Sequence, residues 1–183
     1  VAVPCTETWI NPNETTSVEL LDGRVMLNVR SESKAHCRLV TTSADGATGW
    51  SEPRFDEALK EPICMGSLVR YPARPGVAPA GLLFSNPDNL TCRKGKEVPG
   101  KNRDRINLTV KFSADEGRTW PVGRVIEPGP SMYSDLAVAQ DGTILCFYGR
   151  SLKAGSNGFA GDRLTLARFG LEWLKGPSKD AQP

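Results

Sequence analysis

Tyr133 is the residue whose setting first suggests chemistry. It lies in PGPSMYSDLAVAQDGTILCFYGR, from Pro128 to Arg150, among small and polar neighbours and directly before an alternating run typical of a strand. Core tyrosines are usually framed by apolar residues, and strand ends commonly open onto clefts. A phenol has a pKa of about 10, so chemistry by a tyrosine at neutral pH needs help, which a carboxylate within hydrogen-bond reach can give by taking the proton. The competing interpretation is a half-buried tyrosine that packs its ring at the entrance of a strand.

The cysteine and histidine content argues against a metal site or another bound cofactor. The chain has five cysteines, no CxxC pair and one histidine, His36, for which we expect a plain packing or surface role. Cys64 and Cys92 bracket a predicted hairpin and have the option of a disulfide, although their spacing alone does not establish one. Because the number of cysteines is odd, at least one thiol lies outside any disulfide within the chain.

Composition excludes two further classes of partner. The chain is 39% hydrophobic and 24% charged, which is the balance of a globular protein. No run approaches the roughly 18 apolar residues of a membrane span. A net charge of +2 gives no reason to expect a nucleic-acid partner. The basic run Cys92–Arg105 contains glycine, proline and interleaved acids, so we interpret it as a solvated loop.

Short strands dominate the chain. Asp22-Gly23 and Asp141-Gly142 are hairpin signals, because Asp-Gly readily adopts the positive φ of tight turns. Asp56–Pro62 suggests one short helical turn, and no long segment keeps a 3.6-residue period, so we predict an all-β protein. The expected strands are Ser17–Leu21, Arg24–Arg30, Cys37–Ser43, Ser67–Tyr71, Gly81–Ser85, Ile106–Ser113, Gly123–Glu127, Asp135–Ala139, Thr143–Tyr148 and Leu164–Phe169.

A weak internal repeat indicates the architecture. SADEGRTW, which ends at Trp120, has an echo in SADGATGW, which ends at Trp50. In each, a strand ends, a Ser-x-Asp turn follows and a tryptophan opens the next strand, so that side chains satisfy the turn amides while the indole packs beneath. Three similar sheets of about four strands suggest β-propeller blades. Three blades are too few for closure, so we expect the chain to be part of a larger propeller. Another chain, a second copy of this chain or further residues of the same protein would complete it.

Three segments together resemble the sialidase (neuraminidase) family. Ser-x-Asp-x-Gly-x-Thr-Trp at Ser113–Trp120 resembles the sialidase Asp-box. NETTSVELLDGRVMLNVR resembles the bacterial segment with the catalytic glutamate and an arginine 16 positions later, here Glu14 and Arg30. RINLTVKFSADEGRTWPVGRVIEPGPSMYSDL resembles the segment that runs from a second arginine to the nucleophilic tyrosine, here Arg105 and Tyr133, 28 positions apart. The resemblance covers about 165 residues.

The resemblance implies a six-bladed β-propeller of which residues 1–183 form the C-terminal half. This half would supply about three four-stranded antiparallel blades, roughly 1–60, 61–127 and 128–175, followed by a tail, 176–183. The chain begins at Val1 without methionine or a visible signal peptide, so we expect a processed N-terminus. The N-terminal half of the propeller is then an expected partner.

The resemblance also implies a reaction, the release of terminal sialic acid by a retaining exo-α-sialidase. Sialic acid carries a carboxylate on its anomeric carbon, and arginine grips carboxylates with paired hydrogen bonds, the role implied for Arg30 and Arg105. A neutral phenol avoids the repulsion that an anionic nucleophile would meet there, which suits Tyr133 with Glu14 as its base. The family's N-terminal arginine and its aspartate acid have no counterpart here, so we expect the 183 residues alone to be inactive or nearly so.

Each of these residues has an ordinary structural alternative. By itself Glu14 would be a solvated loop acid, and Arg30 and Arg105 would be surface arginines. Glu19 competes with Glu14, and Arg103 competes with Arg105; the spacings of the resemblance favour Glu14 and Arg105.

One departure keeps alternative functions open. The family's strand after the tyrosine typically ends in Tyr-Glu, where the glutamate braces the N-terminal arginine, whereas here it ends in Tyr148-Gly149. A propeller that binds sialylated glycans without hydrolysis, or a trans-sialidase, is therefore an alternative to the hydrolase. No signal defines the compartment; the substrate class favours a secreted or periplasmic bacterial protein.

Overall fold

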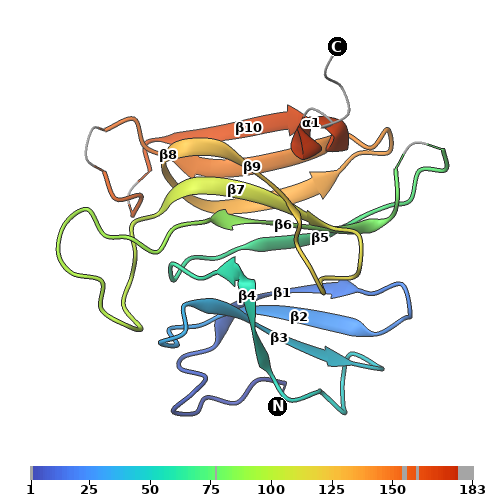
Figure 1. Ribbon diagram of the computed structural model, residues 1–183, viewed down its shortest axis with the longest axis horizontal. Helices are drawn as coiled ribbons and strands as arrows, with labels where there is room; N and C mark the ends of the chain where they lie inside the picture. Colours follow the sequence, from blue (N-terminus) through green and yellow to red (C-terminus); the bar gives the residue numbers. More distant parts are fainter. Residues whose placement is uncertain (1, 77, 154–155, 160, 177–183) are drawn as a thin grey trace.

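The computed structural model describes residues 2–76, 78–153, 156–159 and 161–176. Within them, ten strands and one five-residue helix confirm the all-β prediction. The strands form two antiparallel sheets, one ordered β1-β2-β3-β4 and the other β10-β9-β8-β7-β6-β5. Figure 1 shows the strands rising in layers from the first sheet at the bottom, near the N-terminus, to β10 at the top, near the C-terminus. The predicted tail, 176–183, lies outside the described residues apart from Gly176.

Most strand bounds follow the predicted pattern, but β1 begins four residues earlier than the predicted Ser17–Leu21, and two larger exceptions are described below. The first sheet contains β1 (Asn13–Glu19), β2 (Val25–Arg30), β3 (Cys37–Ser43) and β4 (Arg54–Lys60). The second sheet contains β5 (Ser67–Tyr71), β6 (Gly81–Pro87), β7 (Ile106–Ser113), β8 (Val122–Val138), β9 (Ile144–Arg150) and β10 (Arg163–Phe169). The helix α1 (Leu171–Lys175) follows β10.

The strand β8 is the first exception, because it is continuous where two strands were predicted. Its first part, up to Pro130, pairs with β7, and its second part, from Ser131, pairs with β9. Gly129 and its flanking prolines suggested a break, but at Pro130 the strand changes partner instead of ending. The two predicted strands therefore join neighbouring layers into one six-stranded sheet, and the number of blades stays a prediction.

Two hydrophobic cores lie between the layers. Alternation along β6 supplies both: Leu82 and Phe84 face the first sheet, and Leu83 faces the β8–β10 layer. The core toward the first sheet also contains Leu20, Met26, Val40, Leu59 and Leu68. The other also contains Tyr71, Leu108, Val110, Phe112, Leu136, Ile144, Cys146, Tyr148, Leu171 and Leu174. Layers that share cores in this way give a propeller-like stack.

The helical turn predicted at Asp56–Pro62 is wrong. Residues Arg54–Lys60 form β4, which pairs with β3 through Arg38 and Asp56, with a register shift beside Cys37. Isolated helices this short are unstable in water, so pairing with β3 and burial of Leu59 override the local helix propensity.

The Asp-box turn has the hydrogen bonds that its sequence predicts. Ser113 Oγ donates to Asp115 Oδ1 at 2.7 Å, and the Thr119 hydroxyl donates to Asp115 Oδ2 at 2.7 Å. The echo at Ser43–Trp50 forms an equivalent cage around Asp45, but there Thr48 donates, one position earlier than the motif predicts.

The structure also addresses the cysteine, metal and membrane predictions. Cys64 and Cys92 are free thiols, so the optional disulfide is not formed. Within the described ranges, no group of three or more His, Cys, Asp or Glu side chains is arranged to hold a metal ion. In the same part of the chain, no helix has the length and apolar character needed to cross a membrane.

Candidate active site

Glu14 and Arg30 face each other at one end of the first sheet. Asn13 pairs with Arg30 and Thr15 pairs with Val29, so Glu14 occupies a β-bulge, with φ of 31°. A bulge redirects a side chain out of the regular alternation and is common beside functional sites. The bulge turns the Glu14 carboxylate toward the guanidinium of Arg30.

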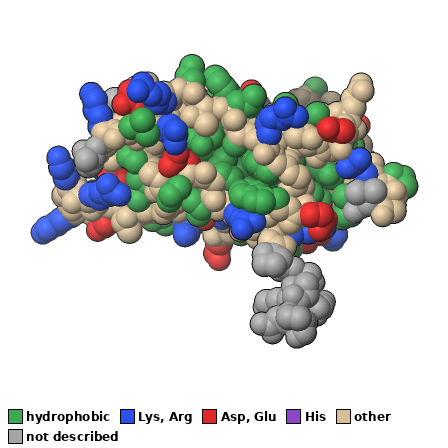
Figure 2. Space-filling view, turned by 90° about the horizontal axis from the view of Figure 1, so that it is seen from above, with side chains coloured by type: hydrophobic (Ala, Val, Ile, Leu, Met, Phe, Trp, Pro, Cys, Tyr) green, Lys and Arg blue, Asp and Glu red, His purple; other side chains and the backbone are tan. Residues whose placement is uncertain are grey.

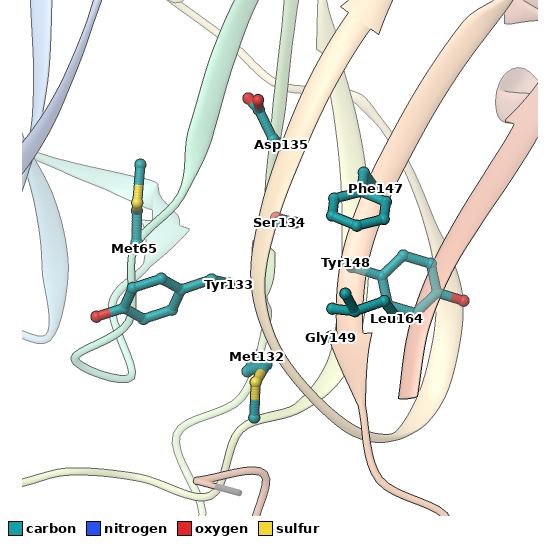
Figure 3. Close-up of a pocket in the computed structure, with 9 residues that line it drawn as sticks. All are labelled: Met65, Met132, Tyr133, Ser134, Asp135, Phe147, Tyr148, Gly149 and Leu164. Atoms are coloured by element: carbon teal, nitrogen blue, oxygen red, sulfur yellow. The ribbon is translucent and has the colours of Figure 1, made fainter. Parts of the chain in front are cut away.

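Tyr133 lies inside β8, not before a strand as predicted. Ser131 pairs with Arg150 and Ser134 pairs with Tyr148, so Tyr133 also lies in a bulge, just after β8 changes partner. Ser134 is buried and shares a 2.8 Å hydrogen bond with Ser85 of β6, which fixes the backbone beside Tyr133. Figure 3 shows the Tyr133 ring extending from β8 toward Met65, with its hydroxyl directed away from the β9 side chains.

Three of the four predicted site residues share one hydrogen-bond cluster. The Tyr133 hydroxyl donates to Glu14 Oε1, and Arg30 Nη1 donates to Glu14 Oε2. Arg30 Nη1 also donates to the Tyr133 oxygen at 3.2 Å. Residues that are more than 100 positions apart in the chain thus meet where the first sheet approaches β8. Tyr133 remains 41% exposed, so its hydroxyl region is open to a ligand.

The cluster shifts the pKa values of two of its members. Burial raises the pKa of Tyr133, and the hydrogen bond and charge of Glu14 add to the rise, while Arg30 opposes it. For Arg30, burial lowers the pKa, but the hydrogen bond and charge of Glu14 outweigh burial and raise it. The resting site therefore holds a neutral phenol between a carboxylate and a guanidinium that stays charged.

Arg105 reaches the site from the loop before β7. Its guanidinium carbon lies 5.5 Å from the centre of the Tyr133 ring and 4.5 Å from that of Phe159. Its Nη2 donates to the Ile63 carbonyl at 2.8 Å. Arg105 does not hydrogen-bond to the Tyr133 hydroxyl among the described contacts, so it flanks the cluster without being part of it.

The loop that carries Phe159 is packed tightly on Arg105. The Arg105 N–H donates to the Asn157 carbonyl at 2.7 Å, and the Ser131 N–H donates to the Arg105 carbonyl at 2.9 Å. Gly158 has φ of 79°, and a Cβ there would lie 2.1 Å from the Arg105 carbonyl oxygen. Only glycine fits this approach, which brings Phe159 over the Arg105 guanidinium.

The two rivals to the predicted residues lie outside this cluster. The Glu19 carbonyl accepts hydrogen bonds from Arg70, at the opposite end of β1 from Glu14. Arg103 Nη1 donates to the Val98 and Lys101 carbonyls and thereby holds its own loop together. The geometry therefore favours Glu14 and Arg105 over their rivals.

Gly149, where the resemblance breaks, faces a methionine instead of an acid. A Cβ at Gly149 would lie 2.6 Å from Cγ of Met132, and one at Gly161 would lie 3.0 Å from its Sδ. Met132 thus fills space between two glycines beside Tyr133. It also lines an open, mostly apolar cavity of about 310 Å³. The cavity is bounded by Met65, Met132, Tyr133, Ser134, Asp135, Phe147, Tyr148, Gly149 and Leu164 (Figure 3).

Sequence reasoning missed the groups that hold Arg105 in place. The Ile63 carbonyl and the Phe159 ring lie on loops that match no motif, although Gly158 marks the close approach in the second loop. Behind Ile63, Arg38 and Glu61 form an ion pair in which neither side chain is exposed. No local signal could have found this pair, because its members lie 23 positions apart on different sides of a turn.

Comparisons with known proteins identify the family of the chain. The family model described as a BNR repeat-like domain matches residues 6–146. A sialidase from Micromonospora viridifaciens is 35% identical over 170 residues, which cover 91% of this chain and 23% of that protein. The chain therefore corresponds to about a quarter of the length of this relative.

Solved structures of similar fold also match most of this chain and a minor part of their own length. The Hadza microbial sialidase Hz136 has a TM-score of 0.69 at 30% identity, over 90% of this chain and 28% of the other. A leech intramolecular trans-sialidase, determined with 2,7-anhydro-Neu5Ac, has a TM-score of 0.66 at 20% identity, over 88% of this chain and 24% of the other. The second similarity concerns the fold alone.

Proposed function

The chain belongs to the sialidase family through its BNR repeat-like domain, and from that premise we propose that it carries the nucleophilic half of an exo-α-sialidase site. The observation that carries the proposal is the hydrogen bond from the Tyr133 hydroxyl to Glu14. Tyr133 is the nucleophile, Glu14 is its base, and Arg30 and Arg105 bind the substrate carboxylate.

The charges of the site suit an anionic sugar. Glu14 contributes one negative charge, and Arg30 and Arg105 contribute two positive charges. Neither Nη2 of Arg30 nor Nη1 of Arg105 has a hydrogen bond to another described residue, so both remain available to a carboxylate. Arginine donors pair well with carboxylates, and a half-buried site strengthens such bonds.

The reaction that we propose proceeds in two steps. The Tyr133 oxygen forms a bond to the anomeric carbon as the glycosidic C–O bond breaks, and the phenol proton passes to Glu14. The leaving oxygen takes a proton from a carboxylic acid. Water then attacks the anomeric carbon and gives a proton to the carboxylate left on that acid. Tyr133 leaves and recovers its proton from Glu14, and sialic acid is released with retained configuration.

We propose that the acid and a third arginine come from further propeller blades outside this chain. The matched length, about a quarter of the Micromonospora relative, supports this view. So does the outer face of β9 and β10, where Phe147, Leu164 and Leu166 are 47%, 74% and 55% exposed. Figure 2 looks onto the β10 side and shows hydrophobic side chains along its middle. Such a surface suits the face of a neighbouring blade. The 183 residues alone are then inactive or nearly so.

The test uses the longest polypeptide that the gene encodes, with a fluorogenic sialoside as substrate. Tyr133→Phe keeps the ring under Arg105 but removes the nucleophile, and we expect a loss of roughly 1,000-fold or more in kcat. A fluorinated sialosyl fluoride, which slows breakdown of the intermediate, should leave a covalent adduct on the peptide that contains Tyr133. Wild-type turnover by Tyr133→Phe would refute the assignment of the nucleophile.

A second candidate function, a glycan-binding propeller without hydrolysis, rests on Gly149. The family's glutamate at this place would brace an arginine, and here Met132 occupies the space. Sialoside binding without turnover by the wild-type protein would favour this candidate. Transfer of sialic acid to an added sugar acceptor, measured against release to water, would identify a trans-sialidase.

A further inference from the structure

The ion pair of Arg38 and Glu61 lies beneath the site and has no part in the proposed chemistry. Arg38 comes from β3, and Glu61 follows β4. Arg38 Nη1 lies 2.5 Å from Glu61 Oε2, and neither side chain is exposed. Removing two charges from water costs several kcal/mol per ion, so such a pair is poor evidence for stability in itself. Its hydrogen bonds indicate what it holds in place.

The pair clamps the peptide groups of Cys64. Glu61 Oε1 accepts the Cys64 N–H at 2.8 Å, and Arg38 Nη1 donates to the Cys64 carbonyl at 3.2 Å. Burial raises the pKa of Glu61, while Arg38 and the Cys64 N–H oppose that rise. The carboxylate thus folds the chain into a tight turn from Glu61 to Cys64, in which Ile63 has φ of 66°. A β-branched residue is strained at that angle, so surrounding contacts must maintain it.

This turn, residues 61–64, is bonded to the loop that carries Arg105. The Ile63 carbonyl accepts from Arg105 Nη2 at 2.8 Å, and the Pro62 carbonyl accepts from the Arg103 N–H at 3.2 Å. His36 adds a third link, because its Nδ1 bonds to the Glu61 carbonyl and its Nε2 accepts the Gly100 N–H, each at 3.0 Å. The turn therefore sets both the side chain of Arg105 and the path of its loop.

The same pair also reaches the strand of Arg30. Arg38 Nε donates to the Asn28 side chain at 2.7 Å, and Arg38 Nη2 donates to the Asn28 carbonyl at 3.3 Å. Asn28 lies two residues before Arg30 on β2, hence on the same face. The route to Arg105 is the more direct one, because it ends in a hydrogen bond to the guanidinium itself.

We propose that Glu61 is a positioning residue, which orients the Arg105 guanidinium toward the substrate carboxylate through the Ile63 carbonyl. This inference rests on the proposed function for its kinetic consequence but not for its structural one. Glu61 does not touch substrate. Its loss lets the 61–64 turn relax, so that Nη2 of Arg105 loses its fixed acceptor and the guanidinium takes several orientations.

The kinetic test is Glu61→Gln in the longest polypeptide that the gene encodes, since glutamine keeps the acceptor for Cys64 but loses the charge that holds Arg38. We expect KM for a sialoside to rise about tenfold, the scale of one hydrogen bond to a charged group, with kcat changed less than threefold. In an Arg105→Ala background the same substitution should leave KM unchanged. Effects that simply add in the double variant would overturn the proposal.

A matched control separates positioning from loss of stability. Arg70 and Glu116 form another arginine–glutamate pair, at 2.7 Å and partly exposed, beside the Asp-box turn and away from Tyr133. Glu116→Gln should lower thermal stability without a change in KM. Should Glu61→Gln fail to fold, Arg38→Met/Glu61→Leu removes both charges together and leaves neither unpaired. That double variant should also show the raised KM, and a wild-type KM in it would count against the proposal.

A structural readout keeps the inference independent of turnover. In ¹⁵N NMR spectra, the Arg105 guanidinium resonances of Glu61→Gln should broaden or shift relative to those of the wild type, because loss of the charge that holds Arg38 loosens the 61–64 turn and the Ile63 carbonyl with it. If the wild type has no sialidase activity but these changes occur, the proposed function fails and the positioning role stands. Unchanged Arg105 resonances in a folded Glu61→Gln variant would overturn the positioning role, whatever the activity.

Discussion

Two arginine–glutamate pairs belong to the first sheet, and they differ in burial and in how fully they are bonded. Arg38 and Glu61 have no exposed side-chain surface, and backbone or amide groups occupy their remaining hydrogen-bonding positions. Arg30 and Glu14 retain 13% and 30% exposure, and their third partner is the hydroxyl of Tyr133. The same two residue types thus form a fixed clamp in one place and, in the other, a partly exposed cluster that we propose accepts a proton.

The comparison indicates that the chemical role of each arginine–glutamate pair depends on which hydrogen-bonding groups the pair leaves available to other partners. Both oxygens of the Glu61 carboxylate are hydrogen-bonded to buried groups, Arg38 and the Cys64 N–H, so this carboxylate has a fixed structural role. Glu14 is bonded to a phenol that gives up its proton in the proposed reaction, and a β-bulge instead of a deep core holds Glu14. Four predictions probe this contrast, in order of decreasing effect.

Glu14→Gln should abolish the reactive role without affecting the fold. Glutamine cannot take the phenol proton, so we expect kcat to fall by roughly 100- to 10,000-fold, the range for loss of a general base. The free energy of unfolding should change by less than about 0.5 kcal/mol, because the site is partly exposed. Steady-state kinetics and urea unfolding measure the two effects. A large loss of stability would mean that the two pairs do not differ in the way described.

Glu61→Ala should show the reverse pattern. It leaves the Arg38 charge buried without a partner, which costs about 3–5 kcal/mol of stability. Arg38→Met/Glu61→Leu should recover most of that loss. Chemical unfolding of the wild type, Glu61→Ala and the double variant measures these differences. A loss of unfolding free energy below about 1 kcal/mol in Glu61→Ala would contradict the description of the buried pair as a fixed clamp.

The titration of Tyr133 should report the bond to Glu14 directly. Burial, then the hydrogen bond and charge of Glu14, raise the pKa of Tyr133, and Arg30 lowers it. Glu14→Gln should therefore lower the pKa of Tyr133. Ultraviolet phenolate absorbance, with the Tyr133→Phe signal subtracted, gives the value. An unchanged pKa of Tyr133 would exclude the bond to Glu14 in solution.

Asp115 distinguishes the effect of hydrogen bonding from the effect of burial, because its carboxylate accepts several hydrogen bonds although it lies near the surface. Burial would raise its pKa, but hydrogen bonds from Thr119 and Ser113 lower it to about 2. The lowered value means that its stabilising effect is complete above the unfolded pKa of about 3.9 and is lost as pH falls toward 2. The stability gap between wild type and Asp115→Asn should therefore narrow from pH 5 to pH 2. A constant gap would show that the turn does not depend on the carboxylate charge.

Much of the site could be predicted from the sequence, because its residues lie in segments with their own signals. The resemblance to sialidase segments selected Glu14 and Arg30 by their 16-residue spacing, and Arg105 with Tyr133 by their 28-residue spacing, whereas the strand pattern alone left Glu14 in a turn-like stretch. The bulges at Glu14 and Tyr133 could not be predicted, since a register shift depends on the partner strand.

The errors have a common physical cause. Residues of β4 have local helix propensity, and Pro128 and Pro130 suggest a break in β8, yet long-range pairing decides both. The clamp of Arg38 and Glu61 also depends on contacts between distant parts of the chain. Its effect on the site comes from the 61–64 turn that it closes and from the bond between that turn and the loop of Arg105. Local patterns predicted elements and motif residues, but not the contacts that orient them.

The continuity of β8 limits how this protein can be divided or recombined. A chain opened at Asp141-Gly142 would keep both ladders of β8, whereas one opened between Pro130 and Ser131 would separate them two residues before Tyr133. Splitting the gene into complementing halves should therefore succeed at the hairpin and fail at the strand. Exchange of segments with relatives would have to move β7, β8 and β9 as one unit, so Tyr133 is inherited together with both of its neighbouring layers.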